Sequence, residues 1–153
     1  MPKQQGIKQA AANRKAYHDY FVLDRYEAGI ELFGTEVKSI RAGTLNLKDA
    51  YCTVKNGELF VRGMHISPDE KGNIFNRDPD RARRLLMHKQ EIRKLNAKVM
   101  QEGIALIPLS VYFKDSRVKV EVGLCKGKKL YDKRESDAKR QADRDIDRTL
   151  KNR

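Results

Sequence analysis

The sequence has no tryptophan, only two cysteines and only four prolines in 153 residues. It also lacks an apolar run of about 18 residues or more, which a membrane-spanning helix requires. Residues 1–15 are polar and contain no apolar segment typical of a signal peptide. Cys52 and Cys125 lie far apart without a CxxC spacing, so we expect reduced thiols and a cytoplasmic protein without a membrane partner.

Sequence signals of catalysis are equally sparse. The three histidines are scattered, and no HExxH, GxSxG or phosphate-loop pattern occurs. Asp78 and Asp80 are compatible with a magnesium-dependent nuclease, but a helix cap explains them with fewer assumptions. We therefore predict a protein that is not an enzyme and has no cofactor and no metal site, with a nuclease as the weaker alternative.

Positive charge is abundant and unevenly placed. The chain has 33 Lys and Arg against 21 Asp and Glu, a formal net charge of +12. Residues 1–15 carry four basic and no acidic residues, residues 126–153 carry eleven basic against six acidic, and the stretch between them is nearly balanced. This distribution favours a nucleic acid as the partner, because phosphate groups attract clustered Lys and Arg.

Residues 126–153 form a separate segment in this interpretation. They contain too few apolar side chains to offset the entropy of ordering, so the segment alone is expected to be disordered. A helix would nevertheless carry a thin apolar stripe every four residues, at Ala138, Ala142, Ile146 and Leu150, beside a cationic row at Arg140, Arg144 and Arg148. We predict two parts, a body at 1–125 and a basic tail at 126–153 that becomes helical against a polyanion.

The body contains the signals of a small antiparallel β structure. The pair Asn56-Gly57, between two apolar segments, predicts a hairpin with a type I′ turn. Two further hairpins are expected, one within 17–32 turning near 27–29, and one within 104–125 turning at 114–116. Pro108 indicates an edge position or a bulge in the last of these.

Two helices are expected beside the strands. A short one lies within 34–43, and a longer one is predicted to begin with Asp78 as cap and Pro79 as first residue and to end at Gly103. Strands of this number avoid exposed edges best by closing on themselves. The predicted fold class is mainly β with peripheral α-helices, an OB-like antiparallel barrel, although strand spacing alone does not exclude a sandwich.

Six segments in order resemble the SsrA-binding protein family, also called small protein B: NRKAYHDYF, EAGIEL, GTEVKSIRAG, NLKDAY, DPDRARRLLMHKQEI and GLCKGKKLYDKR. The resemblance implies an RNA-binding adaptor that binds the tRNA-like domain of transfer-messenger RNA and delivers it to stalled ribosomes for trans-translation. It implies that the tail is helical on the ribosome, where it probes the empty messenger channel. Elongation factor Tu would be an indirect partner, and the protein a monomer.

The resemblance, together with local charge, selects the candidate RNA-binding residues. Asn13 and Glu27 would hydrogen-bond RNA groups, Leu86 would be an exposed apolar contact, and the cations would meet phosphates. The full set is Asn13, Arg14, Lys15, Glu27, Lys38, Arg41, Arg81, Arg83, Arg84 and Leu86.

Several alternatives stay open for these residues. The segment around Asn13 also fits a solvated terminus, and Lys38 and Arg41 fit equally a segment that packs the barrel. Composition does not decide whether Leu85 or Leu86 points outward. A general structured-RNA-binding or ribosome-associated protein is the alternative function.

The candidate ribosome-contacting residues all belong to the tail. Lys126, Lys128 and Lys129 are expected to form a flexible cationic hinge with Gly127. Tyr131 stands where some family members have histidine, and its ring retains the ability to stack on a base. The set is Lys126, Lys128, Lys129, Tyr131, Asp132, Lys133, Arg134, Arg140, Arg144 and Arg148.

Overall fold

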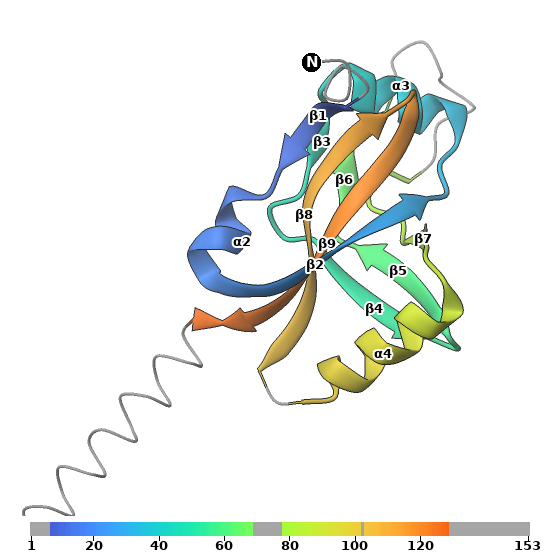
Figure 1. Ribbon diagram of the computed structural model, residues 1–153. Coiled ribbons are helices and arrows are strands. Elements are labelled where there is room, and N and C mark those ends of the chain that lie inside the picture. Colours follow the sequence, from blue (N-terminus) through green and yellow to red (C-terminus); the bar gives the residue numbers. More distant parts are fainter. Residues whose placement is uncertain (1–6, 69–77, 102, 129–153) are drawn as a thin grey trace, which may run out of the picture.

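A closed ring of antiparallel strands forms the body of the protein in a computed structural model that describes residues 7–68, 78–101 and 103–128 (Figure 1). The strands of the main sheet follow the order β1-β8-β4-β5-β7-β2-β9, and β8 also pairs with β9, which closes the barrel. The predicted mainly β, OB-like barrel with peripheral helices is confirmed. The bounds are β1 Ile7–Ala12, α2 Arg14–Asp19, β2 Tyr20–Ile30, α3 Gly34–Arg41, β3 Leu45–Asn46, β4 Tyr51–Lys55, β5 Glu58–Arg62, β6 His65–Ile66, β7 Arg83–Leu86, α4 Lys89–Val99, β8 Ile104–Lys114 and β9 Arg117–Gly127.

Two of the three predicted hairpins are confirmed. In the β4–β5 hairpin, Asn56 and Gly57 have φ of 54° and 75°, the positive values that a type I′ turn needs at both positions. The β8–β9 hairpin turns at Asp115 and Ser116, which also have positive φ. The register of this pair shifts just after Pro108, so the predicted bulge is confirmed as well.

The predicted first hairpin is wrong, because β2 is one continuous strand. Glu27, Ala28 and Gly29 pair with Glu121, Val120 and Lys119 of β9 instead of forming a turn. The strand bends at a register shift between Val22 and Asp24. A bulge therefore supplies the curvature that barrel closure requires, and the glycine is not needed for a turn.

The long predicted helix from Asp78 is also wrong in its first half. Arg83–Leu86 is strand β7, which pairs with β2 on one side and β5 on the other. Asp78 and Pro79 lie in a turn, and α4 begins only after His88. Without β7 the barrel would have two unpaired edges, so the tertiary pairing outweighs the local helical pattern.

The core fills the barrel and extends beneath α4. Its largest cluster includes buried residues from β4, β5, β7, β8 and β9, and α4 adds Ile92 and Leu95. Cys52 and Cys125 are both buried and free, and burial raises the pKa of the Cys125 thiol to about 11. Among the described helices, none has both the length and the apolarity to cross a membrane.

Strand β9 continues two residues past the end of the predicted body at residue 125. Lys126 and Gly127 belong to β9 and pair with Phe21 and Tyr20 of β2, so this part is not the flexible hinge that was expected. Its pairing with two neighbours, β2 and β8, explains why it is held. The predicted helical tail beyond residue 128 lies outside the described residues.

Asn13 ties three separate segments together just before α2. Its side-chain oxygen accepts a hydrogen bond from the Ala16 N–H, which caps the helix. Its amide nitrogen donates to the carbonyl oxygens of Leu47, at 3.1 Å, and Pro108, at 3.0 Å. The residue is 3% exposed, so its polar atoms serve the fold.

Replacing Asn13 with Ala is expected to lower the free energy of unfolding by about 2 to 4 kcal/mol, because it removes a helix cap and leaves two buried carbonyl groups unpaired. Urea denaturation of the full-length chain measures this loss. Lys48→Ala, a change at an exposed neighbour of Leu47, is the control and should cost less than about 0.5 kcal/mol. Equal stabilities of N13A and wild type would contradict a structural role for Asn13.

Candidate nucleic-acid interface

Alternate residues of β7 point into and out of the barrel. Leu85 is 1% exposed, whereas Leu86 is 45% exposed. Of the two leucines, Leu86 is therefore the one on the surface, as the resemblance implied. Arg84 lies on the same outward side, two residues before it.

The outward face continues from Leu86 onto β2. Leu86 pairs with Gly29, where a Cβ atom would lie 3.3 Å from the Leu86 Cβ, so the glycine leaves room for the leucine against the sheet. Glu27 is two residues earlier on β2 and is exposed on the same side. We call the surface formed by Glu27, Arg84, Leu86, Tyr112 and Lys114 the Leu86 face.

Glu27 is held in place by two side chains of β8. The Tyr112 hydroxyl donates a short hydrogen bond to one carboxylate oxygen, and Lys114 Nζ lies 3.4 Å from the other. The Tyr112 bond and then the Lys114 charge lower the pKa of Glu27. Glu27 therefore stays ionised at neutral pH and presents an oriented hydrogen-bond acceptor, which suits the amino and imino groups of a base.

Arg84 also has protein partners on this face. Its guanidinium lies 3.2 Å from a carboxylate oxygen of Glu31 and 3.8 Å from one of Glu58. Both pairs are exposed, so each contributes at most about 1 kcal/mol and can be exchanged for another anion. Arg84 remains accessible to a phosphate, in competition with two carboxylates.

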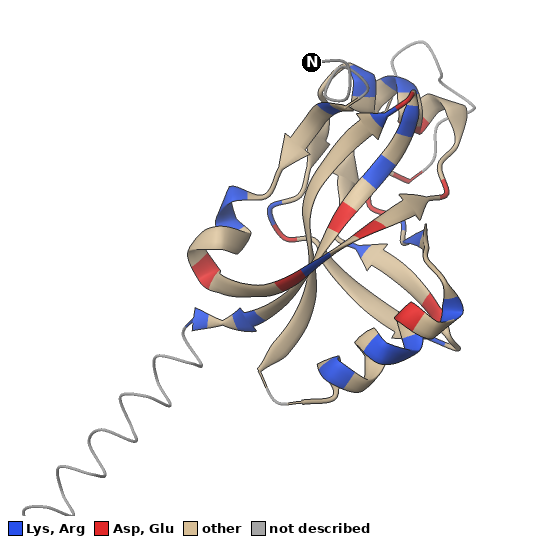
Figure 2. Cartoon of the chain, viewed as in Figure 1, with Lys and Arg blue, Asp and Glu red and all other residues tan. Residues whose placement is uncertain are grey.

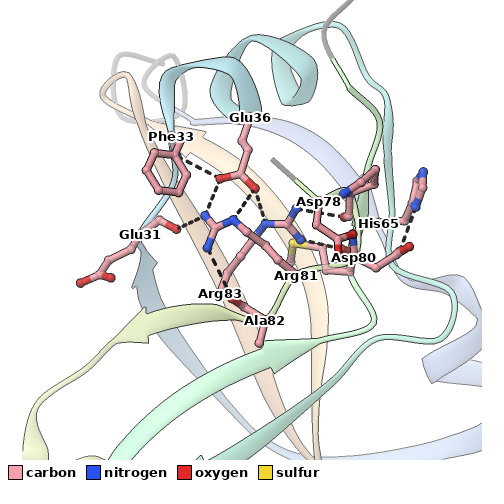
Figure 3. A network of polar contacts seen from close by, with 11 residues as sticks. Glu31, Phe33, Glu36, His65, Asp78, Asp80, Arg81, Ala82 and Arg83 are labelled. Carbon is pink, nitrogen blue, oxygen red and sulfur yellow. Dashed lines mark hydrogen bonds and ion pairs between the residues drawn. The ribbon is translucent and has the colours of Figure 1, made fainter. Parts of the chain in front are cut away.

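Arg81 and Arg83 meet at one buried carboxylate (Figure 3). Glu36 of α3 accepts from Arg81 Nη2 at 2.5 Å and from Arg83 Nε at 2.6 Å, and it also accepts from the Phe33 N–H at 2.9 Å. Glu36 is 4% exposed. This arrangement, which we call the Glu36 network, joins α3 to the segment leading into β7.

The expected phosphate contact by Arg83 does not agree with this arrangement. Arg83 is 0% exposed, and its other nitrogens donate to the carbonyl oxygens of Met64, at 2.6 Å, and Pro79, at 3.0 Å. Its charge is neutralised inside the protein. Arg81 is partly exposed, and its guanidinium also lies 4.8 Å from the Phe33 ring centre.

The N-terminal candidates separate into a buried and an exposed part. Asn13 has both amide hydrogens committed within the protein, so the expected contact with a base does not fit its position. Arg14 and Lys15 follow on the exposed side of α2, and Lys15 lies 3.2 Å from Asp49. Arg14 has no ion-pair partner among the residues that the structure describes.

The remaining candidates lie on other elements. Lys38 and Arg41 are exposed on α3, and the Arg41 guanidinium lies 5.6 Å from the Phe113 ring centre. Lys126 is the last residue but one of β9. Lys128 donates to the Tyr17 carbonyl oxygen at 2.9 Å and lies over Phe21. Outside the described residues are Lys129, Tyr131, Asp132, Lys133, Arg134, Arg140, Arg144 and Arg148.

The residue type alone does not show whether a Lys or Arg is paired inside the protein or available to a phosphate. Figure 2 shows Lys and Arg spread over α2, α3, α4 and β9. Glu36 and Tyr112 were not among the sequence candidates, and the sequence offers no local signal for their partners, which are 45 and 85 residues away. No three His, Cys, Asp or Glu side chains within the described ranges form a group that could hold a metal ion.

Replacing Glu36 with Gln is expected to lower the free energy of unfolding by about 3 to 5 kcal/mol, because it leaves the buried Arg83 without its counterion. Urea denaturation at neutral pH tests this. Glu31→Gln is the matched control, since its pair with Arg84 is exposed and should cost less than about 1 kcal/mol.

The pH dependence of stability provides a second measurement on the same variant. Burial alone would raise the pKa of Glu36, but the bonds from Arg81, Phe33 and Arg83 outweigh it and lower the pKa. The stabilisation is therefore present above the unfolded-state value near 4.5 and is lost as the pH falls through the folded-state value. E36Q should show a weaker decline of stability in acid than wild type; an equal decline would contradict the assignment.

Comparisons with known proteins agree over nearly the whole chain. The family model described as SmpB protein matches residues 10–152. The SsrA-binding protein of Acetivibrio thermocellus is 64% identical over 141 residues, which are 92% of this chain and 92% of that protein. The SsrA-binding protein of Clostridium tetani is 59% identical and covers 100% of this chain, with 98% of its own length matched.

One solved structure is similar in both sequence and fold. It is described as "tmRNA-SmpB: a journey to the center of the bacterial ribosome", and the matched chain is 48% identical with a TM-score of 0.67. The match covers 77% of this chain and 83% of that one. From the matching segments, the barrel and these relatives together, we conclude that the chain belongs to the SmpB protein family.

Proposed function

We propose that this protein is an adaptor that binds the tRNA-like domain of transfer-messenger RNA and delivers it to stalled ribosomes for trans-translation. The observation that carries the proposal is the outward position of Leu86 beside Glu27, in a chain that belongs to this family. The body performs no chemical step in this proposal. It acts as a monomer in the cytoplasm, and elongation factor Tu meets it only through charged transfer-messenger RNA.

The Leu86 face supplies the specific part of RNA binding. An exposed leucine can pack against a sugar or an unstacked base. The oriented Glu27 carboxylate accepts hydrogen bonds from the amino and imino groups of a base, whereas a phosphate has no hydrogen to donate to it. Tyr112 and Lys114 position that carboxylate. Arg14, which has no carboxylate partner among the described residues, adds attraction to phosphates without reading the sequence.

The tail supplies the second part of the function. β9 ends at Gly127, two residues into the proposed tail. Residues 132–153 would extend about 33 Å as a helix at about 1.5 Å per residue. Such a helix enters a messenger channel that is empty downstream of the stall and is excluded when the messenger is complete.

A general structured-RNA-binding protein is the alternative. It would bind ordinary tRNA and transfer-messenger RNA with similar affinity at the same salt concentration. A competition assay with both RNAs separates the two functions, because the proposed adaptor prefers the tRNA-like domain of transfer-messenger RNA.

Deleting residues 132–153 is expected to leave binding to isolated transfer-messenger RNA within about threefold of wild type, because the Leu86 face is intact. Peptide tagging on ribosomes stalled at truncated messengers should be lost. Gel-shift titration and a reconstituted tagging reaction measure the two effects. A loss of RNA binding as large as the loss of tagging would contradict this division between body and tail.

Exchanging Glu27 for Gln and Arg14 for Gln should produce two different salt dependences. E27Q is expected to weaken transfer-messenger RNA binding and leave the slope of log affinity against log salt nearly unchanged, because no phosphate contact is lost. R14Q should reduce the slope by about 0.7 to 0.9. Filter binding at several salt concentrations gives both slopes; a slope change in E27Q as large as in R14Q would show that Glu27 acts through charge.

A further inference from the structure

A cavity of about 490 Å³ lies between β1, the C-terminal end of α3 and the β8–β9 turn. Its walls include Lys8 from β1, Ile40 and Arg41 from α3, Phe113 from β8, and Asp115 and Ser116 from the turn. Pockets for small ligands and single bases typically measure about 300 to 1,000 Å³ and combine apolar walls with a few polar groups. The cavity has the size and composition of a binding site.

The cavity carries positive charge that the protein does not neutralise. Lys8 and Arg41 are both exposed, and neither forms an ion pair with any residue of the described ranges. Asp115 is the acidic residue of the wall, so the lining has more positive than negative charge. This differs from the Glu36 network, where a carboxylate already occupies both arginines. An anion is the ligand that such a wall attracts.

Arg41 is also oriented before any ligand arrives. Its guanidinium lies 5.6 Å from the centre of the Phe113 ring, a cation–π contact that restricts its direction. The planar group keeps its N–H donors at its edges, where they can form two parallel hydrogen bonds with phosphate oxygens. The contact therefore lowers the entropy lost on binding a phosphate.

The negative end of the α3 dipole does not oppose an anion strongly here. Three carbonyl oxygens in the last turn of the helix, those of Lys38, Ser39 and Ile40, accept hydrogen bonds from the N–H groups of Ala42, Thr44 and Gly43. These bonds satisfy three of the carbonyl groups that carry the partial negative charge. The two cations of the wall oppose what remains of that charge.

We propose that this cavity holds one unpaired nucleotide of an RNA partner. Lys8 and Arg41 bind its phosphates, and the base lies against the exposed part of Phe113, which is 9% exposed. Asp115 accepts a hydrogen bond from an amino or imino group, so it disfavours a second phosphate in its place. The proposal rests on the proposed function, because RNA is the polyanion that this basic chain binds there.

The test begins with the full-length, isotope-labelled protein and the single-stranded RNA hexauridylate. The amide signals of Gly43, Asp115 and Ser116 should shift on titration, while that of Gly57, in the β4–β5 turn at the other end of the molecule (Figure 1), should not. A Lys8→Gln/Arg41→Gln double variant should lose the shifts. Its salt slope should fall by about 1.4 to 1.8, the value for two phosphate contacts.

Lys55→Gln/Lys94→Gln is the matched control, because both lysines are exposed and lie outside the cavity. It should bind hexauridylate like wild type, and thermal melting should show that both double variants are folded. Equal binding by the two double variants, or shifts as large at Gly57 as at Ser116, would overturn the proposal. Uridine 5′-monophosphate that binds as tightly as the hexamer would also overturn it, since the site would then hold a free nucleotide.

Failure of this proposal and failure of the proposed function give different results. If wild type fails to prefer transfer-messenger RNA over ordinary tRNA but the cavity signals shift with hexauridylate, the adaptor function is wrong and the nucleotide site stands. If wild type shows the preference and the cavity variant binds both RNAs and hexauridylate unchanged, the site is wrong and the adaptor function stands.

Discussion

The buried pair between Glu36 and Arg83 fixes which side of β7 faces the solvent. Rotating β7 about its own axis, without sliding it along the sheet, would point Arg83 and Leu85 to solvent and bury Arg84 and Leu86 instead. Only Arg83 has a buried carboxylate and two carbonyl oxygens within 3.0 Å in the described structure. An unpaired buried guanidinium costs several kcal/mol, far more than exchanging one leucine for another. The exposure of Leu86 therefore depends on a residue of α3.

Local sequence signals predicted the turns and the general architecture but failed where long-range pairing decides. Asn56-Gly57 needs positive φ at both positions, and that requirement is readable from two letters. The segment RARRLLMHKQEIRKL has a helical pattern throughout, yet its first half is a strand because the gap between β2 and β5 has to be filled. Likewise, Glu27-Ala28-Gly29 suggested a turn, but β9 offers a pairing partner along the whole of β2.

The candidate site, like the fold, was predictable only where the local sequence decides the structure. The resemblance selected Leu86, and alternation along β7 explains its exposure. Asn13 and Arg83 have the right chemistry for RNA, but a residue type does not show whether its hydrogen bonds are already used inside the protein. Both are buried, and their partners, Pro108 and Glu36, are 95 and 47 residues away. No spacing rule connects such residues, so only the folded structure separates structural polar groups from available ones.

The cations that contribute most to RNA affinity are those without a carboxylate of their own. A Lys or Arg that is already paired with a carboxylate of the protein displaces fewer counterions from the RNA, so it adds less affinity. Arg81 and Arg83 share Glu36, and Arg84 competes with Glu31 and Glu58, so the basic motif around β7 adds less attraction than its sequence indicates. Affinity for transfer-messenger RNA must then come from exposed, unpaired cations elsewhere on the body. In the proposed function the Leu86 face contributes mainly shape and hydrogen-bond complementarity, so that proposal gives affinity and selectivity different locations in this fold.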